Sequence, residues 1–104
     1  MQVPIAITKQ AQIKAAIDAV DRQLRPDVVH IRYEIGQDWS GQWAIFFKVL
    51  LSDEASIDRN LREMAPKFVW SVSDRLDLPE LGLFPHFDFR SQSEQIERNE
   101  PAWA

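Results

Sequence analysis

The chain has 104 residues, a formal net charge of −4 and no cysteine, which predicts one domain, 1–104, with one core. The absence of cysteine excludes thiol catalysis, thiolate metal sites and disulfides, and it fits a reducing, cytoplasmic location. The acidic excess disfavours nonspecific attraction to a nucleic-acid backbone, and no stretch approaches the roughly 20 apolar residues that would span a membrane.

The first periodic segment, residues 8–26, predicts an amphipathic helix. Its apolar residues recur at helical spacing between polar ones: Ile13, Ile17, Val20 and Leu24. Thr8 is expected to cap this helix. Pro26 is expected to end it, because proline disfavours helical geometry in the residue before it.

Residues 28–35 and 43–51 predict two strands. The first, VVHIRYEI, alternates apolar and polar side chains, which is the pattern of a strand with one buried face. Its odd-numbered residues are expected to face the core: Val29, Ile31, Tyr33 and Ile35. The second, WAIFFKVLL, is apolar on both sides, which is typical of a central strand.

The stretch GQDWSGQ, residues 36–42, joins these strands and predicts an ordered turn. Gly36 and Gly41 can adopt a positive φ, and Asp38 and Ser40 can bond to their own backbone. Two hypotheses place Trp39: it folds back as a lid on the core, or it is an exposed contact residue. The lid is favoured, because a tryptophan side chain buries on the order of 200 Å².

Residues 52–76 predict a second helix that begins at Ser52 or Asp53. Its apolar residues again follow helical spacing: Ile57, Leu61, Met64, Ala65, Phe68, Val72 and Leu76. Pro66 interrupts the segment. Since a proline inside a helix costs about 3 kcal/mol, the helix is expected to be kinked there or split in two.

Residues 81–90, LGLFPHFDFR, predict a third strand with Leu83, Phe87 and Phe89 facing inward. Pro85 cannot donate to a ladder, which places this strand at an edge of the sheet or Pro85 outside the pairing. SQSE at 91–94 has the form of a capping box for a short helical turn. The same segment could bind an anion through free backbone N–H groups, but the structural cap is the preferred interpretation.

The C-terminal tail, EPAWA, carries a tryptophan one residue from its end. Burying Trp103 offers enough apolar transfer energy to order the few residues before it, so the tail is expected to dock on its own domain or on a neighbouring subunit. Arg90 is expected to pair with the terminal carboxylate or with Glu34.

These elements predict an α+β two-layer sandwich in the order α-β-β-α-β, with a three-stranded sheet and helices on one face. The sequence leaves open whether the third strand lies beside the first or the second. The other face of the sheet is expected to carry the outward-pointing residues His30, Arg32, Glu34, Phe46, Lys48, Leu50, Phe84, His86, Asp88 and Arg90.

Motifs that carry chemistry are scarce. His30 and His86 share the open face with Glu34 and Asp88, so a metal or acid–base site can be drawn there. Such spacings are common by chance, however, and the sequence has no phosphate-binding glycine loop and no nucleophile elbow. We therefore assign no catalytic residue, no metal ligand and no cofactor, and we keep a small enzyme with a His/Asp site as an alternative.

The pattern favours a protein-interaction module. Phe46, Leu50 and Phe84 are expected to form an apolar patch that a second subunit, a protein partner or a ligand covers, and a homodimer is the expected assembly. The full set of candidate contact residues is Trp39, Phe46, Leu50, Phe84, Arg90 and Trp103.

Two stretches resemble a family of small uncharacterised bacterial proteins. In that family a D-W-[ST]-G turn precedes an apolar strand, and an F-x-F-R-S-Q-S-E-Q segment ends the domain; DWSGQWAIFFKVLL and FDFRSQSEQ match these patterns here. The resemblance implies no established activity. It implies at most a pairing with a HEPN-type protein of the toxin–antitoxin kind.

If Pro66 splits the second helix, the order α-β-β-α-α-β is similar to the type II KH arrangement of ribosome-binding factor A. That resemblance implies RNA binding by the open face, where Arg32, Lys48 and Arg90 accompany Phe46 and Phe84. The chain lacks the G-x-x-G loop of KH domains and has a negative net charge, so RNA is the less favoured partner.

Overall fold

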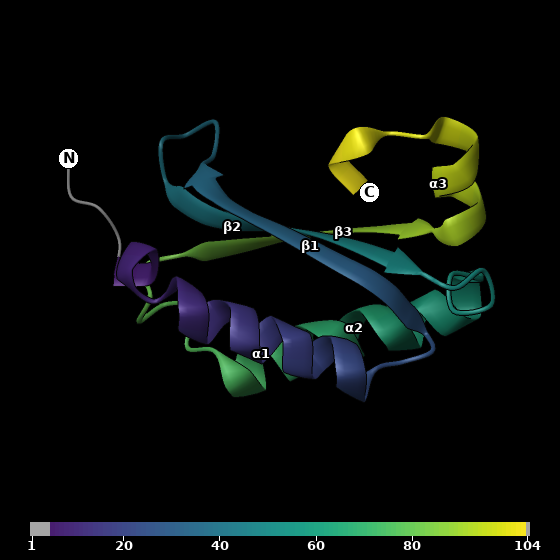
Figure 1. The fold of residues 1–104 in the computed structure, drawn as a ribbon, viewed down its shortest axis with the longest axis horizontal. Coiled ribbons are helices and arrows are strands. Elements are labelled where there is room, and N and C mark those ends of the chain that lie inside the picture. The colour runs from purple at the N-terminus through teal and green to yellow at the C-terminus, as the bar shows by residue number, and fades with distance from the viewer. Residues whose placement is uncertain (1–4, 104) are drawn as a thin grey trace.

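Two helices cover one face of a three-stranded sheet in the computed structural model, which describes residues 5–103 (Figure 1). The helices are α1 (Gln10–Gln23), α2 (Asp58–Arg75) and α3 (Gln92–Arg98), and the strands are β1 (Val28–Gln37), β2 (Trp43–Leu51) and β3 (Phe84–Ser91). Short 3₁₀ turns occupy Ile5–Thr8 and Pro101–Trp103. The predicted α+β class is confirmed, and the predicted element order is extended at its end by α3.

The strand order is β1-β2-β3, so the apolar strand β2 is central, as predicted. β1 and β2 form an antiparallel hairpin, whereas β3 pairs in parallel with β2. Parallel neighbours need a crossover connection, and α2 provides it. This pairing answers the question that the sequence left open, because the third strand lies beside the second.

The core lies between the sheet and the two covering helices. Helix α1 contributes the side chains that its periodicity predicted: Ile13, Ile17 and Val20, followed by Leu24, are all at most 4% exposed. At the centre, the ring of Phe68 from α2 meets Phe47, Phe87 and Phe89 edge-on, at centroid distances of 5.8 to 5.9 Å. Edge-to-face contacts of this kind add to the free energy of burial.

Both long helices begin later than the sequence predicted. Thr8 does not cap α1; its hydroxyl donates to the carbonyl of Ile5 at 2.7 Å, inside the preceding 3₁₀ turn. Ser52 does not cap α2 either, because its hydroxyl accepts from the backbone N–H of Ala55 and closes a separate turn before the helix. In both places a serine or threonine stabilises a local turn in preference to a helix end.

Helix α2 runs through Pro66 as one element, so of the two predicted alternatives, a kink or a split, the split is wrong. Proline removes one backbone donor, which leaves the carbonyl of Arg62 without its helical partner. Pro66 and Arg62 are both exposed, so water can satisfy that carbonyl. None of the helices within residues 5–103 is both long and apolar enough to cross a membrane.

The first strand departs from simple alternation at its start. A register shift between Val28 and His30 places Val28 in the core, fully buried, whereas Val29 was the predicted inward residue. A bulge inserts an extra residue and so exchanges the two sides of a strand locally. Beyond the bulge, Ile31, Tyr33 and Ile35 pack against the core as predicted.

Helix α3 is held by a carboxylate from the turn that follows β2. The hydroxyl of Ser91 accepts from the N–H of Glu94 at 3.0 Å, which confirms the predicted cap. Ser93 donates its backbone N–H to Asp53 at 2.9 Å, and its hydroxyl donates to the same carboxylate. The anion at this helix start is therefore the protein's own Asp53, and the Ser93 hydrogen bonds lower the pKa of Asp53 below its usual value of 3.8.

The hydrogen bonds from Ser93 to Asp53 predict that the stability of the protein depends on pH. Because the folded-state pKa of Asp53 is depressed, the contribution of its carboxylate to the free energy of unfolding is complete above about pH 4. That contribution is lost as the pH falls through the folded-state pKa. We expect Asp53→Asn to lower the melting temperature at pH 7. The difference in melting temperature between the variant and wild type should disappear in acid. Asp74→Asn, which changes an exposed carboxylate on α2, is the control. A difference in melting temperature that is unchanged at pH 2.5 would contradict the stabilising role of the Asp53–Ser93 hydrogen bonds.

Candidate interaction surface

The open face of the sheet is built from four cross-strand rows. Register fixes them, from the end nearest α3 to the end nearest the β1–β2 turn: His30, Leu50 and Arg90; Arg32, Lys48 and Asp88; Glu34, Phe46 and His86; Gly36, Ala44 and Phe84. The predicted outward residues therefore share one face. The rows also separate residues that the sequence analysis had grouped together.

The C-terminal segment covers the first two rows. After β3 the chain turns through α3 and folds back over the sheet, on the side away from α1 and α2 (Figure 1). Trp103 is 3% exposed. Its ring lies 4.3 Å from the guanidinium carbon of Arg90 and 5.7 Å from Nζ of Lys48, which are cation–π distances. The tail thus docks on its own domain, one of the two arrangements that the sequence predicted.

Polar contacts fix the same segment. Arg90 forms an ion pair with Glu100 at 3.1 Å and donates to Gln95 at 3.0 Å, while Gln95 donates to the carbonyl of Glu100 at 2.8 Å. Arg32 of β1 donates to the carbonyl of Pro101 at 3.2 Å. The predicted Arg90–Glu34 pair is wrong, since the two residues lie in different rows; the predicted pairing with the terminal carboxylate falls at residue 104, outside the described residues.

The predicted apolar patch is divided. Leu50 lies in the row with Arg90, near the tail, whereas Phe46 and Phe84 lie in the last two rows. Lys48 separates Leu50 from Phe46 along β2. Only Phe46 and Phe84 therefore belong to the uncovered half of the face, and Leu50 does not.

His86 is the centre of the uncovered half. Phe46 stacks on its imidazole at 5.0 Å with an interplanar angle of 11°, and Phe84 and Trp39 meet it tilted at 5.4 and 5.8 Å. These four residues, Trp39, Phe46, Phe84 and His86, are named the aromatic cluster below. A groove lined by Arg32, Tyr33, Glu34, Phe46, Lys48 and Ala102 separates the cluster from the tail.

The turn that carries Trp39 is ordered, as predicted. Asp38 accepts from the backbone N–H groups of Ser40 and Gln42 at 2.9 and 3.1 Å and from the Ser40 hydroxyl at 2.6 Å. Gly41 has φ +85° and donates to the carbonyl of Asp38, the geometry of a type I turn closed by a glycine bulge. Residues 38–42 thus form a rigid platform at the end of the sheet.

Trp39 is 89% exposed at the tip of this turn, so the predicted lid on the core is wrong. The bonds of Asp38 direct the turn beyond the end of the sheet, and Trp43 at the start of β2 is the tryptophan that packs against the core at this end. The alternative hypothesis of an exposed Trp39 therefore agrees with the structure.

Asp38 also links the turn to the aromatic cluster. Its Oδ2 lies 3.8 Å from Nε2 of His86, an ion-pair distance when the imidazole is protonated. Nε2 is buried and accepts or donates no hydrogen bond within the described chain. The Ser40 hydroxyl is the main cause that lowers the pKa of Asp38, and the backbone N–H groups and His86 add to it, so Asp38 stays ionised beside the imidazole at neutral pH.

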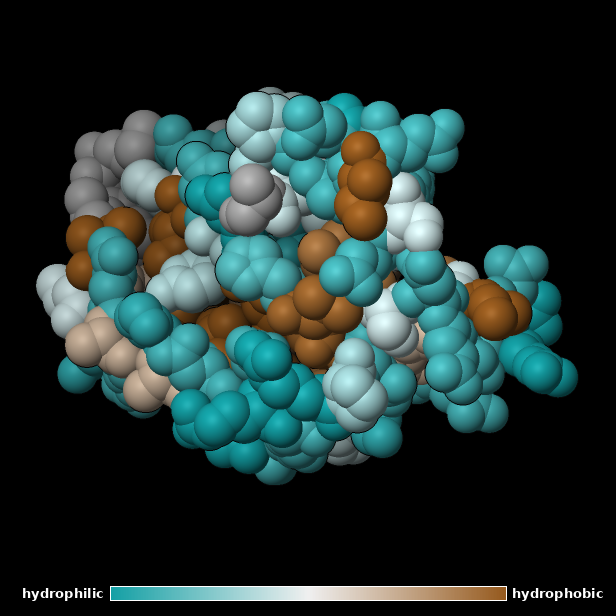
Figure 2. All heavy atoms as spheres, turned by 45° about the vertical axis from the view of Figure 1, so that its right-hand side comes forward, coloured by the Kyte–Doolittle hydropathy of each residue, from teal (hydrophilic) through white to brown (hydrophobic). Residues whose placement is uncertain are grey.

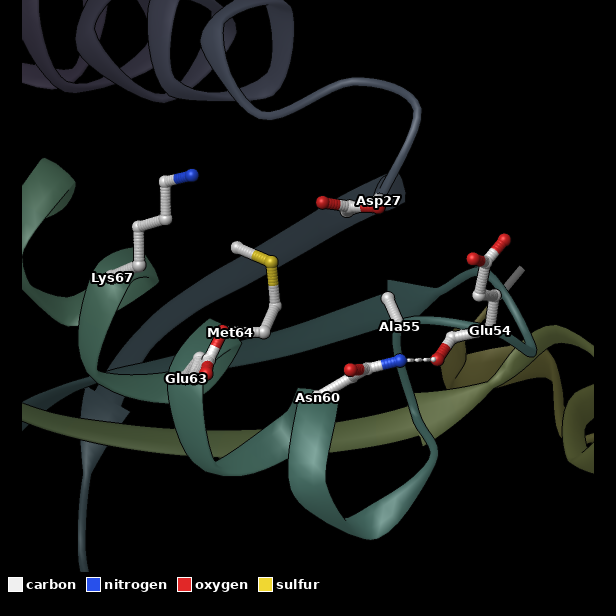
Figure 3. A pocket seen from close by; sticks show the side chains of 7 residues that line it. All are labelled: Asp27, Glu54, Ala55, Asn60, Glu63, Met64 and Lys67. Atoms are coloured by element: carbon white, nitrogen blue, oxygen red, sulfur yellow. Dashed lines mark hydrogen bonds between the residues drawn. The ribbon is translucent and has the colours of Figure 1, made fainter.

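Two hollows outside the open face lie at the ends of α2. One is an apolar groove between the end of α2 and the start of β3, lined by Leu76, Leu78, Leu83, Phe84 and Pro85 among others; it meets the aromatic cluster at Phe84. The other lies between the start of β1 and the first turns of α2 (Figure 3). Its Asp27, Glu54, Glu63 and Lys67 are all exposed, so it is a solvated, mostly acidic hollow without the enclosure of a ligand site.

The two histidines are not brought together. His30 lies in the first row and His86 in the third, on opposite edge strands. Among the described residues, no group of three or more histidine, aspartate or glutamate side chains is placed to hold a metal ion. The basic residues suited to RNA, Arg32, Lys48 and Arg90, contact the protein's own tail.

Comparison with known proteins gives no match: no protein-family model, curated protein or solved structure is significantly similar to the chain.

Sequence reasoning missed the central place of His86 and the apolar groove beside it. His86 was placed on the correct face, but its stacking on Phe46 depends on β3 lying beside β2 in one register, which no local pattern encodes. The groove depends on how residues 76–83 pass from α2 to β3. Leucines at 76, 78, 81 and 83 are the one signal that the sequence offered.

Burial of Trp103 predicts a large loss of stability when the side chain is removed. Trp103→Ala should lower the free energy of unfolding by about 3–5 kcal/mol, the usual range for a buried tryptophan. Trp70, which is 75% exposed on α2, provides the matched control, and Trp70→Ala should change it by less than about 0.5 kcal/mol. Urea unfolding measures both variants. Equal, small effects would show that the tail is not docked.

Proposed function

We propose that the protein is a non-catalytic interaction module that binds another protein through the aromatic cluster. One observation carries this proposal: Trp39 is 89% exposed on a turn that Asp38 holds rigid through three hydrogen bonds. A rigid exposed tryptophan loses little conformational entropy on binding and offers a large apolar contact, which is why tryptophan is enriched in binding hot spots.

The surroundings of Trp39 fit the same role. Phe84 is 51% exposed and meets the same His86 ring as Trp39 does, and the apolar groove of Leu76, Leu78, Leu83 and Pro85 continues the surface past Phe84. Exposed apolar residues that adjoin one another and have a polar border mark interaction sites more often than scattered ones do. Glu34 and Gln42 supply polar groups at the border.

The partner class follows from the resemblance and from the surface chemistry. A pairing with a HEPN-type protein, of the toxin–antitoxin kind, is the heterologous partner that the resemblance implies. The interaction module is also proposed to form a homodimer in the cytoplasm. RNA is disfavoured, because binding it on this face would require Lys48 and Arg90 to give up their contacts with Trp103.

Exchange of the exposed tryptophan tests this function. Tagged wild type, Trp39→Ala and Trp70→Ala are used as baits in an extract of cells that make the protein, and the affinity of each recovered partner is then measured with purified components. We expect Trp39→Ala to weaken binding at least tenfold, with a change in stability below about 0.5 kcal/mol.

Trp70→Ala controls for the loss of an exposed tryptophan elsewhere and should bind like wild type. Partners held with equal affinity by wild type and Trp39→Ala would show that the aromatic cluster is not the contact surface.

A further inference from the structure

Within the described residues, the outer edge of β1 presents backbone groups without a strand partner at Ile31, Tyr33 and Ile35. Within residues 5–103 β1 pairs with β2 alone and forms one edge of the sheet. The N–H of Asp38 donates to the carbonyl of Gln42, and hydrogen-bonded pairs alternate along an antiparallel ladder. The even-numbered residues of β1 therefore bond to β2, and Ile31, Tyr33 and Ile35 turn their N–H and C=O groups outward.

The same three residues carry apolar side chains that are only half-buried. Ile31, Tyr33 and Ile35 pack against the core on their inner side. In the space-filling view, apolar side chains gather in a hollow across the middle of the molecule, above a band of polar side chains (Figure 2). β1 crosses the middle of the fold above α1 (Figure 1). An edge with free backbone groups and incompletely covered apolar residues is a template for another strand.

Edge strands are usually protected against such pairing by proline, by a bulge or by a covering segment. β1 has no proline, and its bulge lies at the start, between Val28 and His30. Residues 30–37 follow it in regular register with β2. Within residues 5–103 no strand covers the outer side of β1. The two exposed charged residues of β1 on the open face, Arg32 and Glu34, have opposite signs.

We propose that this edge binds a second copy of the chain, β1 against β1, about a two-fold axis at Tyr33. In that register Tyr33 faces its own copy, and Ile31 faces Ile35 of the second copy in the hydrogen-bonded positions. Arg32 then lies directly opposite Glu34 of the second copy, twice by symmetry. These are the non-hydrogen-bonded positions, where side chains approach most closely.

Charge complementarity selects this register over its neighbours. An axis at Arg32 would place Arg32 opposite itself, and an axis at Glu34 would place Glu34 opposite itself; like charges directly opposite each other destabilise a strand pair. Among the charged residues of β1, only the axis at Tyr33 pairs Arg32 with Glu34. Arg32 is already held within its own chain, where it donates to the carbonyl of Pro101, and its guanidinium has five N–H donors in all.

The geometry has a structural consequence. A two-fold axis perpendicular to the sheet joins the two sheets into one continuous sheet in the order β3-β2-β1-β1-β2-β3 and keeps both open faces on the same side. The assembly then displays two aromatic clusters on the same face, at opposite ends of the joined sheet. This surface is separate from the aromatic cluster, so the inference rests on the homodimer named in the proposed function and not on partner binding by the cluster.

Charge reversal tests the pairing. Wild type should sediment at twice the chain mass of 12.1 kDa. Glu34→Arg places arginine opposite Arg32 and should halve that mass, and Arg32→Glu should do the same. The double variant Arg32→Glu with Glu34→Arg restores unlike pairs and should return to the dimer mass. Circular dichroism melts confirm that each variant folds.

Cysteine cross-linking tests the register, and the chain has no cysteine of its own. Directly opposite, non-hydrogen-bonded residues have Cα atoms about 4.5 Å apart, within disulfide range. A mixture of Arg32→Cys and Glu34→Cys chains should form a mixed disulfide dimer on oxidation, whereas each variant alone should not cross-link.

Several outcomes would overturn the inference: wild type at monomer mass at every concentration, a Glu34→Arg variant that stays dimeric, or cross-linking of Arg32→Cys with itself. A dimer that Phe46→Glu dissociates and Glu34→Arg does not would place self-association on the open face. That result would contradict the β1–β1 pairing without contradicting partner binding by the aromatic cluster. Conversely, loss of partner binding has no bearing on the edge if the mass data hold.

Discussion

The contact of the Trp103 ring with Arg90 and Lys48 determines which part of the open face stays uncovered. A three-stranded sheet with helices on one side has a second face to cover, and the chain covers half of it with its own last residues. Arg90 is well placed to contact Trp103, because Glu100 and Gln95 hold its guanidinium and only 10% of its side chain is exposed. The tail is thus part of the fold, and the surface that remains is defined by where it ends.

The opposite end of the face is organised by one short turn. Asp38 accepts three hydrogen bonds within residues 38–42 and lies beside His86, so the turn and the third strand are linked although they are far apart in sequence. Phe46, on the central strand β2, stacks on His86 and so joins the cluster to the middle of the sheet. The result is a preorganised aromatic surface whose most exposed member, Trp39, is positioned by backbone geometry and not by packing.

Most of the fold followed from local patterns. Helical periodicity identified the buried side of α1, alternation identified the inner side of β1 after its bulge, and Ser91 was correctly read as a cap. Errors arose where a short-range signal had two uses: Ser52 and Thr8 stabilise turns and not helix starts, and Pro66 is tolerated because it faces solvent. Trp39 was misplaced because its size suggested burial, whereas the hydrogen bonds of Asp38 decide its direction. The divided open face depends on the register between β2 and β3, which composition and periodicity do not contain.

Nuclear magnetic resonance of the four tryptophan side chains tests the central claim, the division of the open face into a tail-covered half and an aromatic half, most directly. The indole of Trp103 should show nuclear Overhauser contacts to the side chains of Arg90 and Lys48 and slow exchange of its N–H. The indole N–H of Trp39 should exchange with water as fast as that of Trp70, while the ring shows contacts to His86. A Trp103 ring without contacts to β2 or β3, or a Trp39 ring with contacts to the core residues Ile45 or Leu83, would contradict the account.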